Sequence, residues 1–280
     1  MALHKIPSLR RWANHLLRRV HLGDIRIRHH WTGSRFLLHS ARHKGYWYFG
    51  KNREKATMLQ FAKLIQKGQT VFDIGGHIGY LALYFSKLVR ESGQVYTFEP
   101  GENNLSYIRE NTAGHTNIHL VEEGVHAADG SLVIHLENQS GQVNSFDPEY
   151  LADYIASNDH FQLTHPQQRL VPVVSLDSFC YQHEIFPHFI KIDAEGSELA
   201  ILNGAKRLLQ EHRPSCMLEL QWQTEKVFDL LTTLGYELYT PHKAPLTHSQ
   251  FPLIDPNVYC IHPLNKQQRE LFFNEPKIAA

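Results

Sequence analysis

Residues 70–80 read TVFDIGGHIGY: a short apolar run that ends in an acid, a glycine turn, and then an apolar helix pattern. This order is typical of a strand, a turn and a helix in which glycines let the backbone approach a ligand without obstruction by Cβ atoms. A second apolar run at 95–98 is followed by Glu99. An acid at the carboxyl end of a neighbouring parallel strand can accept hydrogen bonds from both hydroxyls of a ribose. Two strands therefore converge on a predicted nucleoside site.

The spacing of the turn indicates which nucleoside. Dinucleotide sites usually carry Gly-x-Gly-x-x-Gly, whereas this chain has Asp-x-Gly-Gly-x-x-Gly from Asp73 to Gly79. A carboxylate would repel a pyrophosphate but suits the ammonium and sulfonium groups of S-adenosylmethionine (SAM), so a nicotinamide dehydrogenase is disfavoured. The predicted cofactor contacts are Asp73, Gly75, Gly76, His77, Gly79, Glu99, Pro100, Gly124, Val125 and Asp193.

Residues 189–199, FIKIDAEGSEL, place three acids at the end of an apolar strand and the start of a helix. Open parallel sheets carry their chemistry at this edge. The helix dipole accounts for Glu198 as a first-turn carboxylate, but Lys191 and Asp193 on one face of a core strand are costly to bury unless they are paired. Glu219 ends the next apolar run and reaches the same edge. The predicted catalytic residues are Asp193, Glu195, Lys191 and Glu219.

Four blocks together resemble the FkbM family of SAM-dependent methyltransferases. They are VFDIGGHIGY with the FEP of 98–100, the SLD of 175–177, KIDAEGSELAILNGA from 191, and RPSCMLEL from 213, within a match of about 68–263. The family commonly has Gly-Ala-Asn where this chain has Gly-Gly-His, so His77 places a titratable group beside the expected cofactor. The resemblance implies a class I methyltransferase fold with a seven-stranded sheet whose last strand is antiparallel. It also implies methyl transfer to a hydroxyl of a sugar, glycan or natural-product-like small molecule.

Alternating patterns from residue 56 predict this α/β fold with a parallel sheet. Helices are predicted near 54–66, 78–90, 101–113, 147–157, 196–210 and 223–234, and core strands at 70–74, 94–98, 117–121, 188–193, 215–220, 236–240 and 257–261. We expect a basic N-terminal extension at 1–55 with short β-type pieces at 25–49, a methyltransferase domain at 56–265 and a C-terminal tail at 266–280. The polar insertion at 137–169, between β-type runs, is long for a connection and is predicted to be a substrate lid.

Transfer of a methyl group to a hydroxyl needs a positioned base. Asp193 is the first choice, Glu195, Glu219 and His77 are alternatives, and Lys191 would orient Asp193 or lower the pKa of the acceptor hydroxyl. The acids could instead hold a divalent cation that binds two neighbouring hydroxyls. The 20 histidines show no recognisable ligand spacing, so no metal site is predicted.

The charge of the chain is unevenly distributed. Lys and Arg number 28 against 28 Asp and Glu, yet residues 1–55 hold 13 Lys and Arg and only two acids. An amphipathic basic helix at 8–21 could contact an anionic membrane surface, although packing against the acidic body of the chain is the preferred interpretation. Three separated cysteines and the lack of a signal-like or spanning apolar run favour the cytoplasm. The oligomeric state has no signal in the sequence.

Two other functions remain as alternatives. A nucleic-acid methyltransferase could use the basic arm as its electrostatic footprint, but Asp-Ala-Glu-Gly stands after the strand at 188–193, where such enzymes carry an Asn/Asp-Pro-Pro-aromatic loop. A non-catalytic binding module at a membrane or a partner would not need the acids and glycines of the predicted cofactor site.

Overall fold

A computed structural model describes residues 22–137, 139–157 and 166–274. The chain divides into two compact units, residues 1–53 and 54–280. The helix predicted at 8–21 lies outside the described residues. In the first unit, β1 (Asp24–Arg28) and β2 (Arg35–His39) form an antiparallel hairpin, followed by α2 (Lys44–Phe49) and the short helix η2 (Gly50–Asn52).

The prediction of β-type structure through residue 49 is wrong for 44–49, which are helical. The ring of Tyr46 packs on Phe36, with ring centroids 5.8 Å apart. The indole of Trp47 donates a hydrogen bond to the Ser40 carbonyl at 2.8 Å. These contacts outweigh the preference of aromatic residues for strands, which depends strongly on context.

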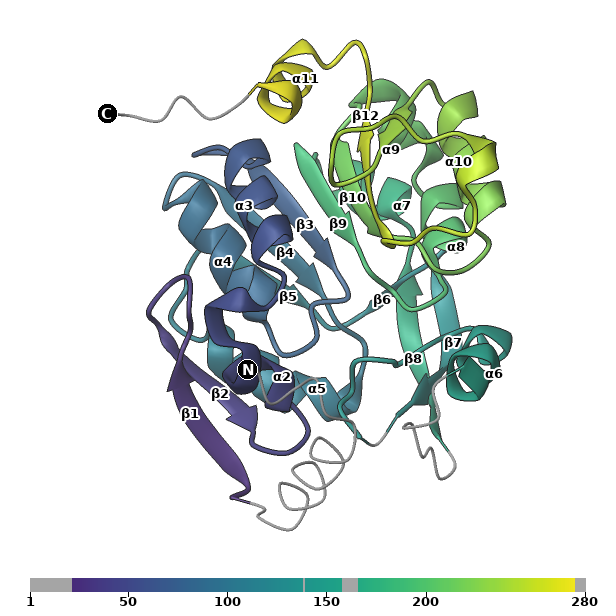
Figure 1. The fold of residues 1–280 in the computed structure, drawn as a ribbon. Helices are drawn as coiled ribbons and strands as arrows, with labels where there is room; N and C mark the ends of the chain where they lie inside the picture. The colour runs from purple at the N-terminus through teal and green to yellow at the C-terminus, as the bar shows by residue number, and fades with distance from the viewer. Residues whose placement is uncertain (1–21, 138, 158–165, 275–280) are drawn as a thin grey trace, which may run out of the picture. The chain divides into compact units, whose positions relative to one another are not determined.

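The second unit is built on the predicted seven-stranded sheet (Figure 1). Its strands, in spatial order, are β11 (Glu237–Tyr239), β12 (Asn257–Ile261), β10 (Ser215–Glu219), β9 (Phe189–Ile192), β3 (Thr70–Ile74), β4 (Gln94–Phe98) and β5 (Ile118–Val121). β12, the last strand, runs antiparallel to both of its neighbours, and the pairs from β10 to β5 are parallel. The class I methyltransferase fold is therefore confirmed.

Helices cover both faces of this sheet. They are α3 (Lys55–Leu64), α4 (Tyr80–Val89), α5 (Glu102–Thr112), α7 (Leu176–His183), α8 (Glu198–Asn203), α9 (Lys206–Glu211), α10 (Thr224–Thr233) and α11 (Lys266–Phe273), with the short helix η3 (His248–Gln250). Phe72 and Ile190 point into a core made with α7 to α10. Phe189, on the opposite face, packs against Phe61 of α3, with centroids 5.8 Å apart. Alternate residues of each central strand therefore face different helix layers, as a strand requires.

The β-type runs predicted on either side of the insertion form a second sheet that was not predicted, and one predicted helix is divided. A second sheet, β6 (Gly124–Val125), β8 (Gln167–Val174) and β7 (Gly130–Leu136), lies with α6 (Pro148–Ser157) beside the large sheet (Figure 1). The single helix predicted at 196–210 is instead α8 and α9. A Cβ atom at Gly204, between them, would lie 2.3 Å from the His126 carbonyl oxygen. Asp177 then caps α9 by accepting from the amides of Arg207 and Leu208 at 3.0 and 2.8 Å, which gives the SLD motif a structural role.

All three cysteines are unpaired and buried. Cys216 and Cys260 are direct neighbours across β10 and β12. Burial raises the pKa of the thiols of Cys180 and Cys216 to about 12, so they stay in the unreactive thiol form.

Candidate active site

The glycine turn lies between the carboxyl ends of three parallel strands. Gly75 and Gly79 have φ values of +79° and +85°, in the left-handed region that favours glycine. A Cβ atom on Gly75 would lie 1.9 Å from the Asp193 carbonyl oxygen, and one on Gly76 would lie 2.1 Å from Oγ1 of Thr97. The glycines are therefore required by the close approach of neighbouring strands, and not only by a ligand.

Glu99 closes the other side of this turn. Its Oε2 accepts a hydrogen bond from the His77 amide at 2.7 Å, and its Oε1 accepts from the Gly101 amide at 2.8 Å and from Nδ2 of Asn104 at 3.2 Å. Burial raises the pKa of Glu99 to about 7 in spite of these three donors. We call Asp73, residues 75–79 and Glu99 the cofactor rim.

Lys191 links the turn to the neighbouring strand. Its Nζ donates to the carbonyl oxygens of Ile74 at 3.3 Å and Gly75 at 3.0 Å, and lies 3.2 Å from Oδ2 of Asp193 and 3.7 Å from Oδ1 of Asp73. Burial lowers the pKa of Lys191, but the charges on Asp193 and Asp73 outweigh burial and raise it. The ammonium is thus shared among groups of the protein, which supports the orienting role and not direct contact with an acceptor hydroxyl.

Asp73 is completely buried, and its pKa is raised by burial, against the lowering effect of Lys191. Its Oδ2 accepts from Oγ1 of Thr97 at 3.3 Å. Its Oδ1 has no hydrogen-bond donor among the described residues. A buried carboxylate oxygen without a donor is unusual, and it fits a site for a cationic ligand.

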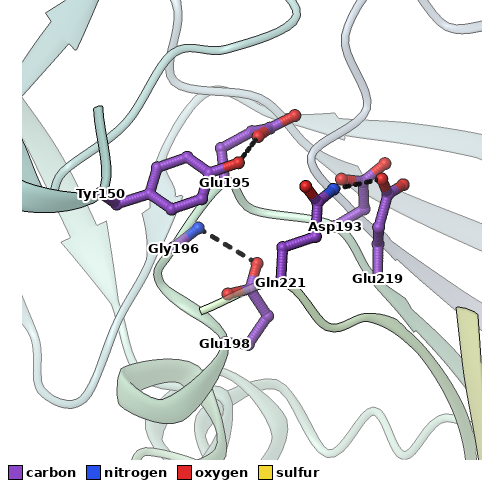
Figure 2. Close-up of a pocket in the computed structure, with 7 residues that line it drawn as sticks. All are labelled: Tyr150, Asp193, Glu195, Gly196, Glu198, Glu219 and Gln221. Atoms are coloured by element: carbon purple, nitrogen blue, oxygen red, sulfur yellow. Dashed lines mark hydrogen bonds between the residues drawn. The ribbon is translucent and has the colours of Figure 1, made fainter. Parts of the chain in front are cut away.

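A small hollow lies at the carboxyl ends of β9 and β10 (Figure 2). Its lining is Tyr150, Asp193, Glu195, Gly196, Glu198, Glu219 and Gln221. Three of the four predicted catalytic residues, Asp193, Glu195 and Glu219, therefore line one hollow. The fourth, Lys191, is buried and contacts Asp193. We call residues 193–198 and Glu219 the acceptor rim.

The carboxylates of the acceptor rim are held by different partners. Oε1 of Glu198 accepts from the amides of Ala194 and Gly196 at 3.1 and 3.3 Å, and burial raises its pKa to about 7. Oε1 of Glu219 accepts from Nε2 of Gln221 at 2.6 Å, and the charge on Asp193, followed by burial, raises its pKa to about 8. The pKa of Glu195 is raised well above its ordinary value by burial and then by Asp193. Perturbed carboxylates gathered in a hollow are typical of functional sites.

The predicted lid reaches this hollow through residues that the sequence did not single out. Tyr150 of α6 donates its hydroxyl proton to Oε2 of Glu195 (Figure 2). Ser145 donates to the Glu195 carbonyl oxygen at 2.6 Å, and Trp222 donates from Nε1 to Oδ2 of Asp147 at 3.0 Å. These residues lie in the polar insertion or after β10 and have no fixed spacing to the motifs, so no sequence pattern identifies them. Residues 138 and 158–165 of the insertion lie outside the described residues.

The remaining predicted cofactor residues lie in different places. Pro100 precedes the Gly101 amide that binds Glu99. Nε2 of His77 lies 3.0 Å from the Ser140 carbonyl oxygen. Gly124 and Val125 form β6, and a Cβ atom on Gly124 would lie 2.5 Å from the Phe146 ring. Contact of β6 with a cofactor stays a prediction.

The residues of the cofactor rim fit SAM. The buried Asp73 carboxylate suits a cationic group, and Glu99 is an acid at the end of β4, where ribose hydroxyls are bound in related sheets. The described residues include no group of three or more His, Cys, Asp or Glu side chains placed to hold a metal ion. No helix in the described parts of the chain is long and apolar enough to cross a membrane.

The family model for the methyltransferase FkbM domain matches residues 73–238. Among solved structures, the chain is similar to an FkbM methyltransferase from Methylobacillus flagellatus KT, at 20% identity and a TM-score of 0.43 over 69% of this chain and 43% of that chain. The chain thus spans less than half of that protein's length.

Two further structures show a similar level of likeness. One is Aeropyrum pernix fibrillarin, in complex with natively bound SAM, at 12% identity and a TM-score of 0.45 over 81% of this chain and 89% of that chain. The other is precorrin-6y C5,15-methyltransferase from Geobacter metallireducens GS-15, at 16% identity and a TM-score of 0.40 over 74% and 86%. No curated protein matches the chain. Family membership therefore rests on the family model, which covers more than half of the chain.

Proposed function

The chain belongs to the FkbM family of SAM-dependent methyltransferases, and from this premise we propose that it methylates a hydroxyl of a sugar, glycan or natural-product-like small molecule. The observation that carries the proposal is the convergence of four carboxylates in the hollow at the carboxyl ends of β9 and β10. A hydroxyl group is a poor nucleophile at neutral pH, and carboxylates are the groups here that can accept its proton. The unpaired, buried cysteines support action in the cytoplasm.

The cofactor rim would hold SAM, with Glu99 accepting from ribose hydroxyls and Asp73 favouring the positive charge. When bound, SAM supplies an electrophilic methyl group. The acceptor rim then has two tasks, because the acceptor oxygen must be aligned for displacement and must lose its proton as the new bond forms.

Glu195 is the carboxylate best suited to take that proton. Asp193, the first choice from the sequence, is 3.2 Å from the Lys191 ammonium and is engaged in holding the turn. Glu198 accepts two backbone amides and serves the loop. Glu195 lines the hollow, and burial followed by the charge on Asp193 raises its pKa, which makes its carboxylate a stronger base. Glu219, which also lines the hollow, is the second candidate.

The test is release of S-adenosylhomocysteine (SAH) from SAM with a panel of sugars, glycans and other hydroxyl compounds as acceptors. Glu195→Gln should lower kcat about 100-fold or more while SAH binding, measured by calorimetry, is unchanged. Glu149→Gln, an exposed acid in the first turn of α6, is the matched control and should keep full activity. If the wild type binds SAM but methylates an amine or a nucleic acid and no hydroxyl compound, the proposed acceptor class is wrong.

A further inference from the structure

Among the described residues, the insertion contacts the acceptor rim at the loop of residues 193–196. The Tyr150 hydroxyl donates to Oε2 of Glu195, and the Ser145 hydroxyl donates to the carbonyl oxygen of the same residue. A Cβ atom on Gly196 would lie 2.6 Å from Cγ of Tyr150, so the ring lies flush against the backbone of this loop. Both hydrogen bonds of the insertion to the loop therefore end on Glu195.

Glu195 is otherwise surrounded by negative charge. Asp193 on its own loop, Glu198 of α8 and Glu219 of β10 all raise its pKa, whereas the Tyr150 hydrogen bond lowers it. The ammonium of Lys191 in β9 is directed at Asp193 and the turn. Tyr154 is a second phenol of α6 whose pKa is raised by burial and then by the charge on Glu195. Within the described residues, Tyr150 is the group that donates a hydrogen bond to the Glu195 carboxylate.

Tyr150 is well suited to remain a donor. It is buried, with 4% of its surface exposed, and its pKa is raised by burial and by the charge on Glu195. Its ring is supported by Trp222, with centroids 6.0 Å apart, and the Trp222 indole donates to Asp147 just before α6. The phenol is therefore fixed in direction by packing on two sides.

We propose that Tyr150 is a positioning residue that holds the Glu195 carboxylate ready to take the acceptor's proton only while α6 is docked on the acceptor rim. This inference rests on the proposed function, since it assigns the way in which the base of that reaction is assembled. The amides of Ala194 and Gly196 in its own loop donate to Glu198 instead, and Asp193 and Glu219 repel the charge on Glu195. Docking of α6 and positioning of the Glu195 carboxylate are then coupled. An acceptor that prevents docking of α6 would also leave the base unpositioned.

The test compares Tyr150→Phe with Tyr154→Phe, which removes a phenol hydroxyl one turn further along the same helix. With wild-type protein and an accepted hydroxyl compound, Tyr150→Phe should lower kcat about 10-fold with little change in KM. Because loss of the hydrogen bond raises the pKa of Glu195, the acid limb of the pH profile should move to higher pH. Tyr154→Phe should leave kcat and the acid limb unchanged. An unmoved acid limb in Tyr150→Phe would overturn the positioning role.

A second measurement reports docking of α6 without requiring methyl transfer. Hydrogen–deuterium exchange of the cofactor-free protein should be several-fold faster in the peptide covering 148–157 for Tyr150→Phe than for wild type or Tyr154→Phe. Equal exchange in all three proteins would overturn the proposal even if the wild type methylates a hydroxyl. Faster exchange in Tyr150→Phe, in a protein that methylates no hydroxyl, would contradict the proposed function and still support the attachment of α6 through Tyr150.

Discussion

Glu99 and Glu195 are acids at the same edge of one sheet, but they are held in different ways. Glu99 accepts two backbone amides, from His77 and Gly101, that the fold fixes. Glu195 accepts a side-chain hydroxyl from a helix that lies outside the large sheet. Glu99 of the cofactor rim is thus held by backbone, whereas Glu195 of the acceptor rim is held by the insertion. Such a division would let a family keep a fixed cofactor site while the insertion that contacts the acceptor varies.

Gly75→Ala is the most severe way to break the cofactor rim. A Cβ atom there meets the Asp193 carbonyl oxygen at 1.9 Å in a left-handed backbone conformation, so we expect a loss of about 4 kcal/mol from overpacking and strain. Denaturant unfolding measures it. Gly114→Ala is the matched control, since Gly114 has φ +82° with nothing within 4 Å of the new Cβ atom, and it should lose about 1 kcal/mol. Equal losses would show that the approach of the strands is not limiting.

Lys191→Met tests whether the two rims are separate at all. Removing the ammonium leaves Asp73 buried beside Asp193 without its cation, and breaking a buried pair in this way costs about 3 kcal/mol or more. Both the free energy of unfolding and the affinity for SAH should fall, because one side chain supports both rims. A variant with normal stability and altered kcat alone would assign Lys191 to the acceptor rim.

The pH dependence of stability compares the rims in the unmodified protein. The pKa values of Glu99 and Glu198 are both raised to about 7 by burial. The folded protein keeps these protons to higher pH than the unfolded chain does, so the free energy of unfolding should fall as pH rises from about 4.5 to 7, by about 3 kcal/mol for each group. Urea titrations at several pH values measure the slope. Glu99→Gln and Glu198→Gln should each flatten it, and a slope unchanged by either variant would contradict the raised pKa values.

Glu99→Gln should sharpen the division by weakening binding at the cofactor rim. Losing a charged acceptor for ribose hydroxyls should weaken SAH binding about 10- to 30-fold, as measured by calorimetric titration. Glu102→Gln, an exposed acid in the first turn of α5, should bind SAH as the wild type does. Equal weakening in both variants would mean that net charge, and not contact, governs binding.

The large sheet could be predicted from sequence because its strands are buried apolar runs of ordinary length. The strands at 70–74, 94–98 and 257–261 have the predicted bounds. The helix break near Gly204 could not be predicted, because Gly204 packs closely on the His126 carbonyl oxygen, almost eighty residues earlier in the chain, and local sequence does not reveal this contact. The helix at 44–49 was missed for a similar reason, since its aromatic residues favour strands and only tertiary contacts make it helical.

Some residues of the site could be predicted from sequence and others could not, as was the case for the fold. The acids and glycines that meet at the sheet edge lie in contiguous motifs, and the rule that parallel strands place their carboxyl ends together brings them to one place. Tyr150, Ser145 and Trp222 were missed because their partners are distant in sequence, 45 residues away in the case of Tyr150 and Glu195. The proposed preference for Glu195 over Asp193 needed coordinates as well, since it depends on which acid lies beside the Lys191 ammonium.

The buried cysteines have a practical consequence for measuring docking of the insertion. Cys180, Cys216 and Cys260 have no exposed surface, and burial raises the pKa of each thiol. A maleimide dye should therefore not react with the native cysteines and should label only a cysteine introduced at the surface. Ala152→Cys, on the exposed side of α6, would give a single-site fluorescent reporter of that helix without first removing any native thiol.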